Sequence, residues 1–561
     1  MSTNTVMNLP EQSQIFRDIK GLVGNDDRIK KIVIESLQKG HTPDSLGIYF
    51  EKTIKEKERK NHGQYYTPRL IVKYILSQLD IQEGSTILDP SCGCGSFLLT
   101  AYDLLGEKYG RACIKNLYGV DINSGAAKIT QACLYMKVNH DKRYSGIILQ
   151  NIKIGNSLVN NKSIDSFAFD WKKEYPRILE SGGFDFIVGN PPYVTLQKYS
   201  GFDPTESIYS KIIEGPTNAA TLMIGKSVDL LNQGGVLAFL LPRSILYVDS
   251  YKKLRSYLIQ NMQILQIVDL GATFRDVRGE QIVLIVKKLK PEKTSKIRIV
   301  DFPVNINLFE PASISVSQVH LQSTNQFPTF NCYHYHTLIE KLSSIGKPLE
   351  LAVNGKIFRG ISIGGNRLHS DCIDSVEAIR GKNIAKFKIR NIMQLERTVL
   401  ADQSRIKTKN LQTKKVMLQN IFSSESGIIA AYDAKGIITL DTVTNICVSD
   451  DIQGKYLLAL LNSKLINFYL IYGVFNLSKL TMHLDKSYIG RIPIIENHDN
   501  RKQKNIIEIV ESILNCDDKT DLKPRIREID KVVYELYSLK ENEVELIEQA
   551  IEKSLSRKSI W

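Results

Sequence analysis

Short apolar runs alternate with helical segments from about residue 64 to residue 290. Residues 68–79 and 251–261, for example, repeat apolar side chains at the spacing of one helix face. Strands separated by helices form parallel sheets covered on both faces, whereas a strand that follows a short link pairs antiparallel with its predecessor. We therefore predict an α/β fold with a doubly wound, mainly parallel sheet that ends in an antiparallel hairpin. The predicted strands lie within residues 85–91, 116–122, 152–157, 184–193, 234–242, 264–270 and 281–289.

The rest of the chain differs in texture and predicts further domains. Residues 1–60 indicate an N-terminal helical segment, residues 61–300 the α/β domain, and residues 301–345 a connector. Residues 346–497 combine short runs, many Lys, Arg and Asn residues and Gly-rich turns, which indicate a second, basic α+β domain. Residues 498–561 return to helical periodicity, so the chain is expected to end in helices.

Charge and cysteine usage narrow the class of protein. The chain carries 74 Lys and Arg against 60 Asp and Glu, a net charge of +14. This surplus favours a polyanionic partner such as nucleic acid, although charge alone is equally compatible with a basic protein that has none. The eight cysteines are scattered without paired spacing, so we predict no metal site and reduced thiols in a cytoplasmic protein. Residues 456–475 include polar side chains and predict a buried helix rather than a membrane span.

The first strand leads into a glycine-containing loop that can hold a nucleotide. Gly93 and Gly95 allow a tight turn and a close approach of the backbone to a ligand. Asp89 lies at the carboxyl end of this strand and Asp121 at the end of the next, where an acid can accept hydrogen bonds from two ribose hydroxyls. Asp89 would repel a phosphate, so the predicted ligand is a nucleoside with a cationic or neutral tail, and S-adenosylmethionine fits. An ordinary strand-to-helix turn with two helix-capping acids is the alternative.

The tetrapeptide Asn190-Pro191-Pro192-Tyr193 is the most specific signal in the chain. Two prolines fix the backbone and remove two N–H donors, while the Asn190 side chain adds an acceptor oxygen. Rigid acceptors can bind both hydrogens of a planar NH₂ group, and the Tyr193 ring can stack on a flipped base. The arrangement suits methyl transfer to an amine held in line with a methyl-sulfonium. An Asn-Pro turn after a strand is the alternative reading.

These residues resemble the γ-class N6-adenine DNA methyltransferases of bacterial restriction–modification systems, in which the cofactor segments precede Asn-Pro-Pro-Tyr and a recognition domain follows. The resemblance implies a Rossmann-like methyltransferase fold, S-adenosylmethionine as cofactor and a target recognition domain at residues 346–497. It also implies a second aromatic, Phe274, against the flipped adenine. The residues that it assigns to the cofactor are Tyr66, Thr67, Pro68, Asp89, Ser91, Gly93, Gly95, Asp121, Ile122, Asn156, Ser157 and Leu158.

One segment departs from the family pattern. The helix after the tetrapeptide usually carries larger side chains, whereas Asn218 is followed here by Ala219, Ala220 and Met223. The departure affects the predicted wall of the base pocket and not the predicted reaction.

The second domain is expected to contact double-stranded DNA. Its basic segments can bind phosphates, and groove-facing Arg, Lys, Asn or Gln side chains can read bases. An exposed surface charge is the simpler reading of each of these residues taken alone. The candidates are Arg359, Asn366, Arg367, Arg380, Lys382 and Asn383.

Three alternatives stay open at this stage. The acceptor could be another planar amine, namely cytosine N4, or an RNA or protein group. The chain could be a bifunctional restriction enzyme, but we expect no cleavage activity and, if anything, a separate cognate endonuclease. It could also be a DNA-binding subunit with a vestigial cofactor site, which the presence of Asp89, Asp121 and Asn190 disfavours.

Overall fold

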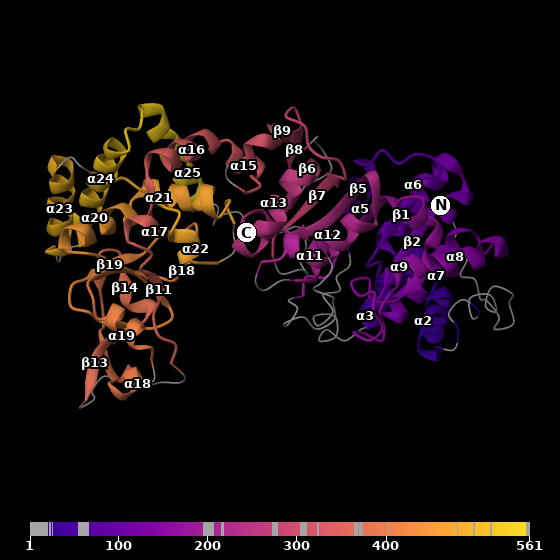
Figure 1. Cartoon of the computed structure of the whole chain (residues 1–561), viewed down its shortest axis with the longest axis horizontal. Helices are drawn as coiled ribbons and strands as arrows, with labels where there is room; N and C mark the ends of the chain where they lie inside the picture. Colours follow the sequence, from indigo (N-terminus) through magenta and orange to yellow (C-terminus); the bar gives the residue numbers. More distant parts are fainter. Residues whose placement is uncertain are drawn as a thin grey trace. The chain divides into compact units, whose positions relative to one another are not determined.

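The computed structural model forms two compact units, Met1–Phe330 and Asn331–Trp561 (Figure 1). Each unit is described here by itself. The residues whose structure is described are 21, 24, 26–53, 67–194, 207–214, 218–271, 279–302, 311–321, 325–363, 368–369, 374–401, 403–478, 481–496, 500–516 and 519–556.

The first unit is built on one large sheet. Within the described residues it has nine strands in the order β3-β2-β1-β4-β5-β7-β6-β8-β9 (Figure 1). Neighbouring strands from β3 to β5 are parallel, whereas β7 pairs antiparallel with both β5 and β6. All seven predicted strands are present, and the predicted hairpin of β6 and β7 is confirmed. The strands are β1 (Ile87–Asp89), β2 (Leu117–Asp121), β3 (Ile152–Ile154), β4 (Phe184–Gly189), β5 (Leu231–Pro242), β6 (Gln263–Gly271), β7 (Gln281–Lys287), β8 (Lys296–Asp301) and β9 (Ala312–Ser317).

Helices pack against this sheet, and strand periodicity explains why both faces are apolar. In β4, Phe186 and Val188 join the core shared with the helices around α6, while Ile187 between them is buried on the opposite side. The helices are α2 (Asp27–Gln38), α3 (Pro43–Thr53), α5 (Arg69–Ser77), α6 (Ser96–Tyr109), α7 (Ser124–Lys137), α8 (Ser145–Asn151), α9 (Trp171–Glu174), α10 (Pro176–Glu180), α11 (Ser207–Ile212), α12 (Ala219–Leu230) and α13 (Lys252–Asn261).

The sheet extends beyond its predicted end. The sequence places a connector from residue 301, but β8 pairs in parallel with β6, and β9 continues the sheet antiparallel to β8. β8 alternates exposed and buried residues before its end, whereas β9 is exposed or half-buried except at Val316, as an edge strand with one solvated face is. Such a weak apolar pattern explains why sequence periodicity did not reveal β9.

The second unit contains smaller sheets and many helices. Two of its sheets have four strands each, in the orders β11-β21-β17-β19 and β12-β16-β13-β20 within the described residues. The strands are β10 (Lys347–Pro348), β11 (Ile357–Arg359), β12 (Leu368–His369), β13 (Ser375–Ile379), β14 (Ile384–Ala385), β15 (Lys388–Ile389), β16 (Met393–Glu396), β17 (Lys415–Gln419), β18 (Ile421–Phe422), β19 (Ala430–Asp433), β20 (Ile438–Thr439), β21 (Val443–Cys447), β22 (Met482–His483) and β23 (Pro493–Ile494).

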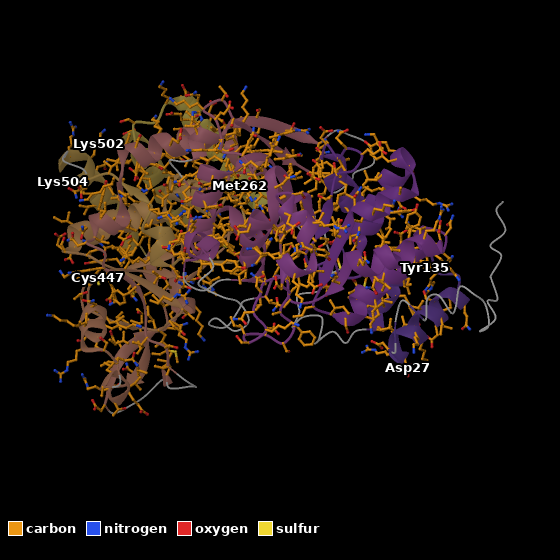
Figure 2. The ribbon with its side chains drawn as sticks, turned by 45° about the vertical axis from the view of Figure 1, so that its right-hand side comes forward. Asp27, Tyr135, Met262, Cys447, Lys502 and Lys504 are labelled. Carbon is orange, nitrogen blue, oxygen red and sulfur yellow. The ribbon has the colours of Figure 1, made fainter. Side chains whose placement is uncertain are left out.

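One core, from Cys332 through to Ile551, joins the helices of the second unit to the β11-β21-β17-β19 sheet, whereas the β12-β16-β13-β20 sheet packs into smaller clusters. Polar Lys502 and Lys504 lie on the exposed side of α23 (Figure 2). The five-part division drawn from the sequence stays a prediction. The helices are α15 (Phe330–Tyr333), α16 (His336–Ile345), α17 (Leu349–Ala352), α18 (Thr398–Ala401), α19 (Arg405–Leu411), α20 (Asp451–Asn462), α21 (Lys464–Phe468), α22 (Lys486–Ile489), α23 (Asn500–Leu514), α24 (Lys519–Leu536) and α25 (Glu541–Ser556).

The most apolar stretch of the chain forms consecutive buried helices. Helix α20 is followed by α21 and a π-helix, Tyr469–Val474, and their apolar side chains belong to the core of the second unit. No single helix among the described residues is long and apolar enough to cross a membrane, although α20 with Lys464–Val474 passes that test as a bent pair, by length and composition alone.

Candidate active site

The loop that follows β1 is held by hydrogen bonds to the neighbouring strand and helix. The backbone N–H of Gly93 donates to Asp121 Oδ2 at 2.7 Å, and Thr130 Oγ1 of α7 donates to the Gly93 carbonyl at 2.8 Å. Gly95 has φ +87°, and a Cβ there would lie 2.9 Å from Thr130 Cγ2. Both the backbone angle and the close approach therefore require glycine at this position. We refer to residues 89–95 as the cofactor loop.

Asp89 is buried at the start of this loop. Its side chain is 2% exposed, and its Oδ1 accepts a hydrogen bond from the Ser91 N–H at 3.0 Å. Burial raises the pKa of Asp89 to about 8; the Ser91 hydrogen bond opposes this rise, and the nearby Asp121 charge adds to it. A cationic group placed against this carboxyl would favour its ionised form, which fits a ligand with a cationic tail.

The two acids do not cap the helices that follow them. Gly95 precedes α6, and the side chain of Asn123 caps α7 by accepting from Gly125 and Ala126. The Asp121 carboxylate instead accepts hydrogen bonds from two backbone N–H groups, that of Gly93 and that of Asn123, the latter at 2.8 Å. The capping alternative is therefore wrong for both acids, and their carboxylates lie at the carboxyl edge of the sheet.

The Asn190–Tyr193 segment, the catalytic loop, meets the cofactor loop directly. It follows Gly189 at the end of β4, where a Cβ would lie 2.7 Å from Asp89 Oδ1. The Tyr193 hydroxyl donates to the Leu240 carbonyl of β5 at 3.0 Å, and burial raises the pKa of Tyr193 well above its ordinary value. The tyrosine is thus tied to the sheet edge as a neutral phenol.

Two polar atoms at this edge are buried without a hydrogen-bond partner among the described residues. They are Ser91 Oγ in the cofactor loop and Asn190 Oδ1 in the catalytic loop. Buried polar atoms are almost always paired, so two orphans at adjacent loops indicate a place that a ligand completes. An unpaired amide oxygen suits an amine donor, as the sequence argument requires of Asn190.

The third segment assigned to the cofactor lies at the ends of β2 and β3. Ser157 Oγ donates to the Pro90 carbonyl at 2.5 Å, which ties this segment to the cofactor loop. Asn156 Oδ1 accepts from the Leu158 N–H at 3.1 Å. Ile122 is 45% exposed and presents an apolar surface next to Asp121.

Sequence reasoning missed two residues near this segment. Asp165 Oδ2 accepts from Asn156 Nδ2 at 2.7 Å, and its Oδ1 accepts from the Phe167 N–H at 2.8 Å. The Phe167 side chain is 55% exposed, unusually high for a phenylalanine. The turn-forming Asn161 and Ser163 could have marked an ordered loop here, but nothing in the sequence points to its partner.

Several predicted residues lie outside the described part of the chain, so no position is given for them: Tyr66, Phe274, Asn366 and Arg367.

Asn218 is the N-cap of α12, the helix whose pattern departs from the family. Its Oδ1 accepts from the Thr221 N–H at 3.0 Å, and its Nδ2 donates to the Tyr251 hydroxyl. Thr67 and Pro68 immediately precede α5, and the Thr67 hydroxyl accepts a hydrogen bond from Asn190 Nδ2 at 3.1 Å.

The described candidates for DNA reading differ in their availability. Arg359 forms a two-bond ion pair with Asp485, at 2.5 and 3.1 Å. Asn383 is buried, and both ends of its amide are already hydrogen-bonded. Its Oδ1 accepts from the Arg380 N–H, and its Nδ2 donates to the Asn391 carbonyl. Asn383 therefore serves a turn rather than a DNA surface, contrary to the prediction. Lys382 between them is exposed.

Comparison with known proteins identifies the family. Residues 41–341 match the N-6 DNA Methylase family, and residues 376–494 match the TaqI-like C-terminal specificity domain. The chain belongs to the N-6 DNA Methylase family. The resemblance drawn from the sequence is confirmed, and the first match covers every described residue of the cofactor and catalytic loops.

Curated relatives are similar over part of their length. The type II methyltransferase M.VspI of Vibrio sp. (strain 343) is 26% identical over 252 residues, 45% of this chain and 54% of that protein. The type II restriction enzyme and methyltransferase RM.Eco57I of Escherichia coli is 25% identical over 279 residues, 41% of this chain and 28% of that protein. The matches thus span about half or less of these relatives.

A solved structure supports the fold of the whole chain. The type IIL restriction-modification enzyme MmeI, solved in complex with DNA, has a TM-score of 0.60 at 15% identity, covering 92% of this chain and 82% of that one. The predicted fold class, a mainly parallel α/β sheet followed by a domain of strands and helices, is confirmed.

Proposed function

We propose that this chain is a site-specific DNA methyltransferase that moves the methyl group of S-adenosylmethionine to N6 of a flipped adenine in duplex DNA. The observation that carries the proposal is the unpaired, buried Asn190 Oδ1 beside the buried Asp89. Family membership and the modification enzymes among the relatives support a role in restriction–modification.

The residues present fit the proposed cofactor. Asp121 lies at the end of β2, where the ribose is proposed to bind, Ile122 offers an apolar surface to adenine, and the neutralised Asp89 lies where a cationic amino-acid tail would restore its charge. Ser91 Oγ supplies a further unpaired hydroxyl at the same edge. When bound, S-adenosylmethionine supplies an electrophilic methyl carbon on a sulfonium.

The catalytic loop would act on the target amine. Asn190 Oδ1 accepts one amine hydrogen and favours a pyramidal nitrogen whose lone pair is free to attack. In the proposed transfer the amine nitrogen would take the methyl group, the electrons of the broken methyl–sulfur bond would leave with the cofactor as a neutral thioether, and the proton lost by the amine would pass to solvent. The Tyr193 ring, tied through its hydroxyl to Leu240, would stack on the flipped base.

The second unit is proposed to hold the duplex. The match to a specificity domain over residues 376–494 supports the predicted recognition domain, and the net charge of +14 suits a polyanion. Lys382 and Arg380 stay candidates for DNA contact. We also propose that a separate cognate endonuclease works with this methyltransferase in a restriction–modification system.

Methylation of genomic DNA tests the function. The purified chain would be incubated with S-adenosylmethionine and unmethylated bacterial DNA, and the modified nucleosides would be identified by mass spectrometry. We expect N6-methyladenine from the unaltered chain and a loss of about 10²–10³-fold in turnover for Asn190→Ala. Asn261→Ala, which replaces an exposed asparagine at the end of α13 in the same unit, is the matched control.

Other outcomes correct the proposal in defined ways. N4-methylcytosine would retain the mechanism and change the base. A chain that binds cofactor but modifies no DNA would overturn the DNA proposal in favour of an RNA or protein amine.

A further inference from the structure

The catalytic amide is held from outside its own loop. Asn190 Nδ2 donates to Thr67 Oγ1 at 3.1 Å, and Thr67 is 3% exposed. The two residues are 123 positions apart in the chain. The other amide atom, Oδ1, is the one left without a partner.

The hydrogen bond anchors one end of the amide, so the other end faces the position of the target. An asparagine turned by half a rotation would present its NH₂ group, with two donors, where the oxygen now lies. A target amine is itself a donor, so only the oxygen can bind it. Two orphaned donors would also cost more than one orphaned acceptor. The Thr67 hydroxyl can accept from Nδ2 or donate to Oδ1, so it holds the amide in place while the target amine selects the orientation that presents Oδ1.

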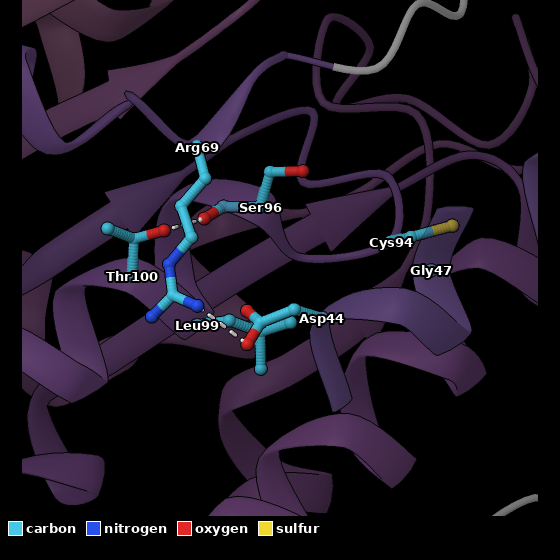
Figure 3. Close-up of a pocket in the computed structure, with 7 residues that line it drawn as sticks. All are labelled: Asp44, Gly47, Arg69, Cys94, Ser96, Leu99 and Thr100. Carbon is cyan, nitrogen blue, oxygen red and sulfur yellow. Dashed lines mark hydrogen bonds and ion pairs between the residues drawn. The ribbon is translucent and has the colours of Figure 1, made fainter. Parts of the chain in front are cut away.

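Thr67 is fixed by an ion-pair network at the start of α5. Arg69 reaches Asp44 of α3 at 2.9 Å and also pairs with Asp103 of α6. Lys137 of α7 binds the same two carboxylates, at 3.2 and 2.8 Å. Figure 3 shows Arg69 extended toward Asp44 beside the cofactor loop. Helices α3, α6 and α7 thus hold the start of α5, which Thr67 closely precedes.

We propose that Thr67 is a positioning residue for Asn190, which orients the catalytic oxygen toward the target amine. This role goes beyond the cofactor contact predicted for Thr67 and rests on the proposed methyl transfer. It links the N-terminal helices to the catalytic loop through one hydroxyl.

A pair of substitutions at residue 67 tests the role. Thr67→Val keeps the shape and removes the hydroxyl, whereas Thr67→Ser keeps the hydroxyl. With saturating cofactor and DNA, we expect the single-turnover methylation rate to fall roughly tenfold to a hundredfold in Thr67→Val, while Thr67→Ser retains activity within about threefold. Melting temperature measured on each variant reports any loss of folding.

A double substitution separates positioning from other roles. If Thr67 acts through Asn190, then Thr67→Val added to Asn190→Ala should reduce the residual rate by less than about twofold, because the amide is already gone. An equal loss in both backgrounds would overturn the inference. So would a Thr67→Val variant with a raised cofactor Kd and an unchanged rate at saturation, which would leave Thr67 as a cofactor contact only.

The unaltered chain distinguishes the two proposals. Absence of methyl transfer from wild type would remove the proposed function. Methyl transfer by wild type with an unaffected Thr67→Val variant would remove only this inference.

Discussion

Buried polar groups are left unpaired at the carboxyl edge of the large sheet, whereas around the β11-β21-β17-β19 sheet of the second unit they pair with one another. In the second unit, Lys415 Nζ binds Asp433 Oδ2 at 2.5 Å, with side chains 0% and 1% exposed. Asn445 Nδ2 similarly donates to Thr439 Oγ1 at 2.8 Å. At the carboxyl edge, Ser91 Oγ and Asn190 Oδ1 are equally buried but unpaired among the described residues. Burial alone does not mark the site; this edge is distinguished by two loops that meet there, each with a buried polar atom that has no partner among the described residues.

The largest effect is expected from breaking the self-satisfied pair. Lys415→Met would leave Asp433 buried without its cation and should lower the free energy of unfolding by about 3–5 kcal/mol. Chemical denaturation measures the change. The neighbouring Lys414→Met removes an exposed pair with Asp451 and should lower the free energy of unfolding far less, because solvent screens that pair. Equal losses in the two variants would contradict the comparison.

The pH dependence of cofactor binding sharpens the other side of the comparison. The Asp89 pKa of about 8 means that its carboxyl is mostly protonated at pH 6 in the free protein. A cationic ligand favours the carboxylate, so binding should release a proton. Affinity should then rise with pH toward 8, by at most about tenfold per pH unit, and level off above it. Calorimetry in two buffers of different ionisation enthalpy measures the released proton.

The matched control for this pH effect is Asp89→Asn. The cofactor has ionisable groups of its own, whose contribution remains in that variant. The wild-type chain should therefore release more protons than Asp89→Asn at pH 7. Identical proton release would show that Asp89 does not titrate on binding.

A smaller effect is expected where the two loops touch. Gly189→Ala would place a methyl 2.7 Å from Asp89 Oδ1 and should displace that carboxyl. We expect cofactor affinity to fall about tenfold, in line with the modest cost of overpacking. Fluorescence titration measures the affinity. Gly146→Ala, where a Cβ meets nothing within 4 Å, should leave it unchanged, and a similar loss there would argue against the contact.

Much of the site could be predicted because its signals are local. The turn glycines, the acids at strand ends and the Asn190–Tyr193 loop each show their chemistry within a few residues of sequence. The edge strand β9 lacked such a pattern, and Asp165 and Phe167 had no recognisable partner in the sequence. Asn383 looked available for DNA, but its amide is consumed by a turn that only the folded backbone reveals.

The sequence by itself determined the alternating sheet, its terminal hairpin, the family and the residues that carry the proposed chemistry, since periodicity and short motifs are written in consecutive residues. Only the tertiary structure decided that Gly189 abuts Asp89, that Thr67 holds the Asn190 amide, and that Ser91 Oγ and Asn190 Oδ1 have no partner among the described residues. Those features depend on the packing of segments up to 123 residues apart, and such distances arise only when the chain has folded.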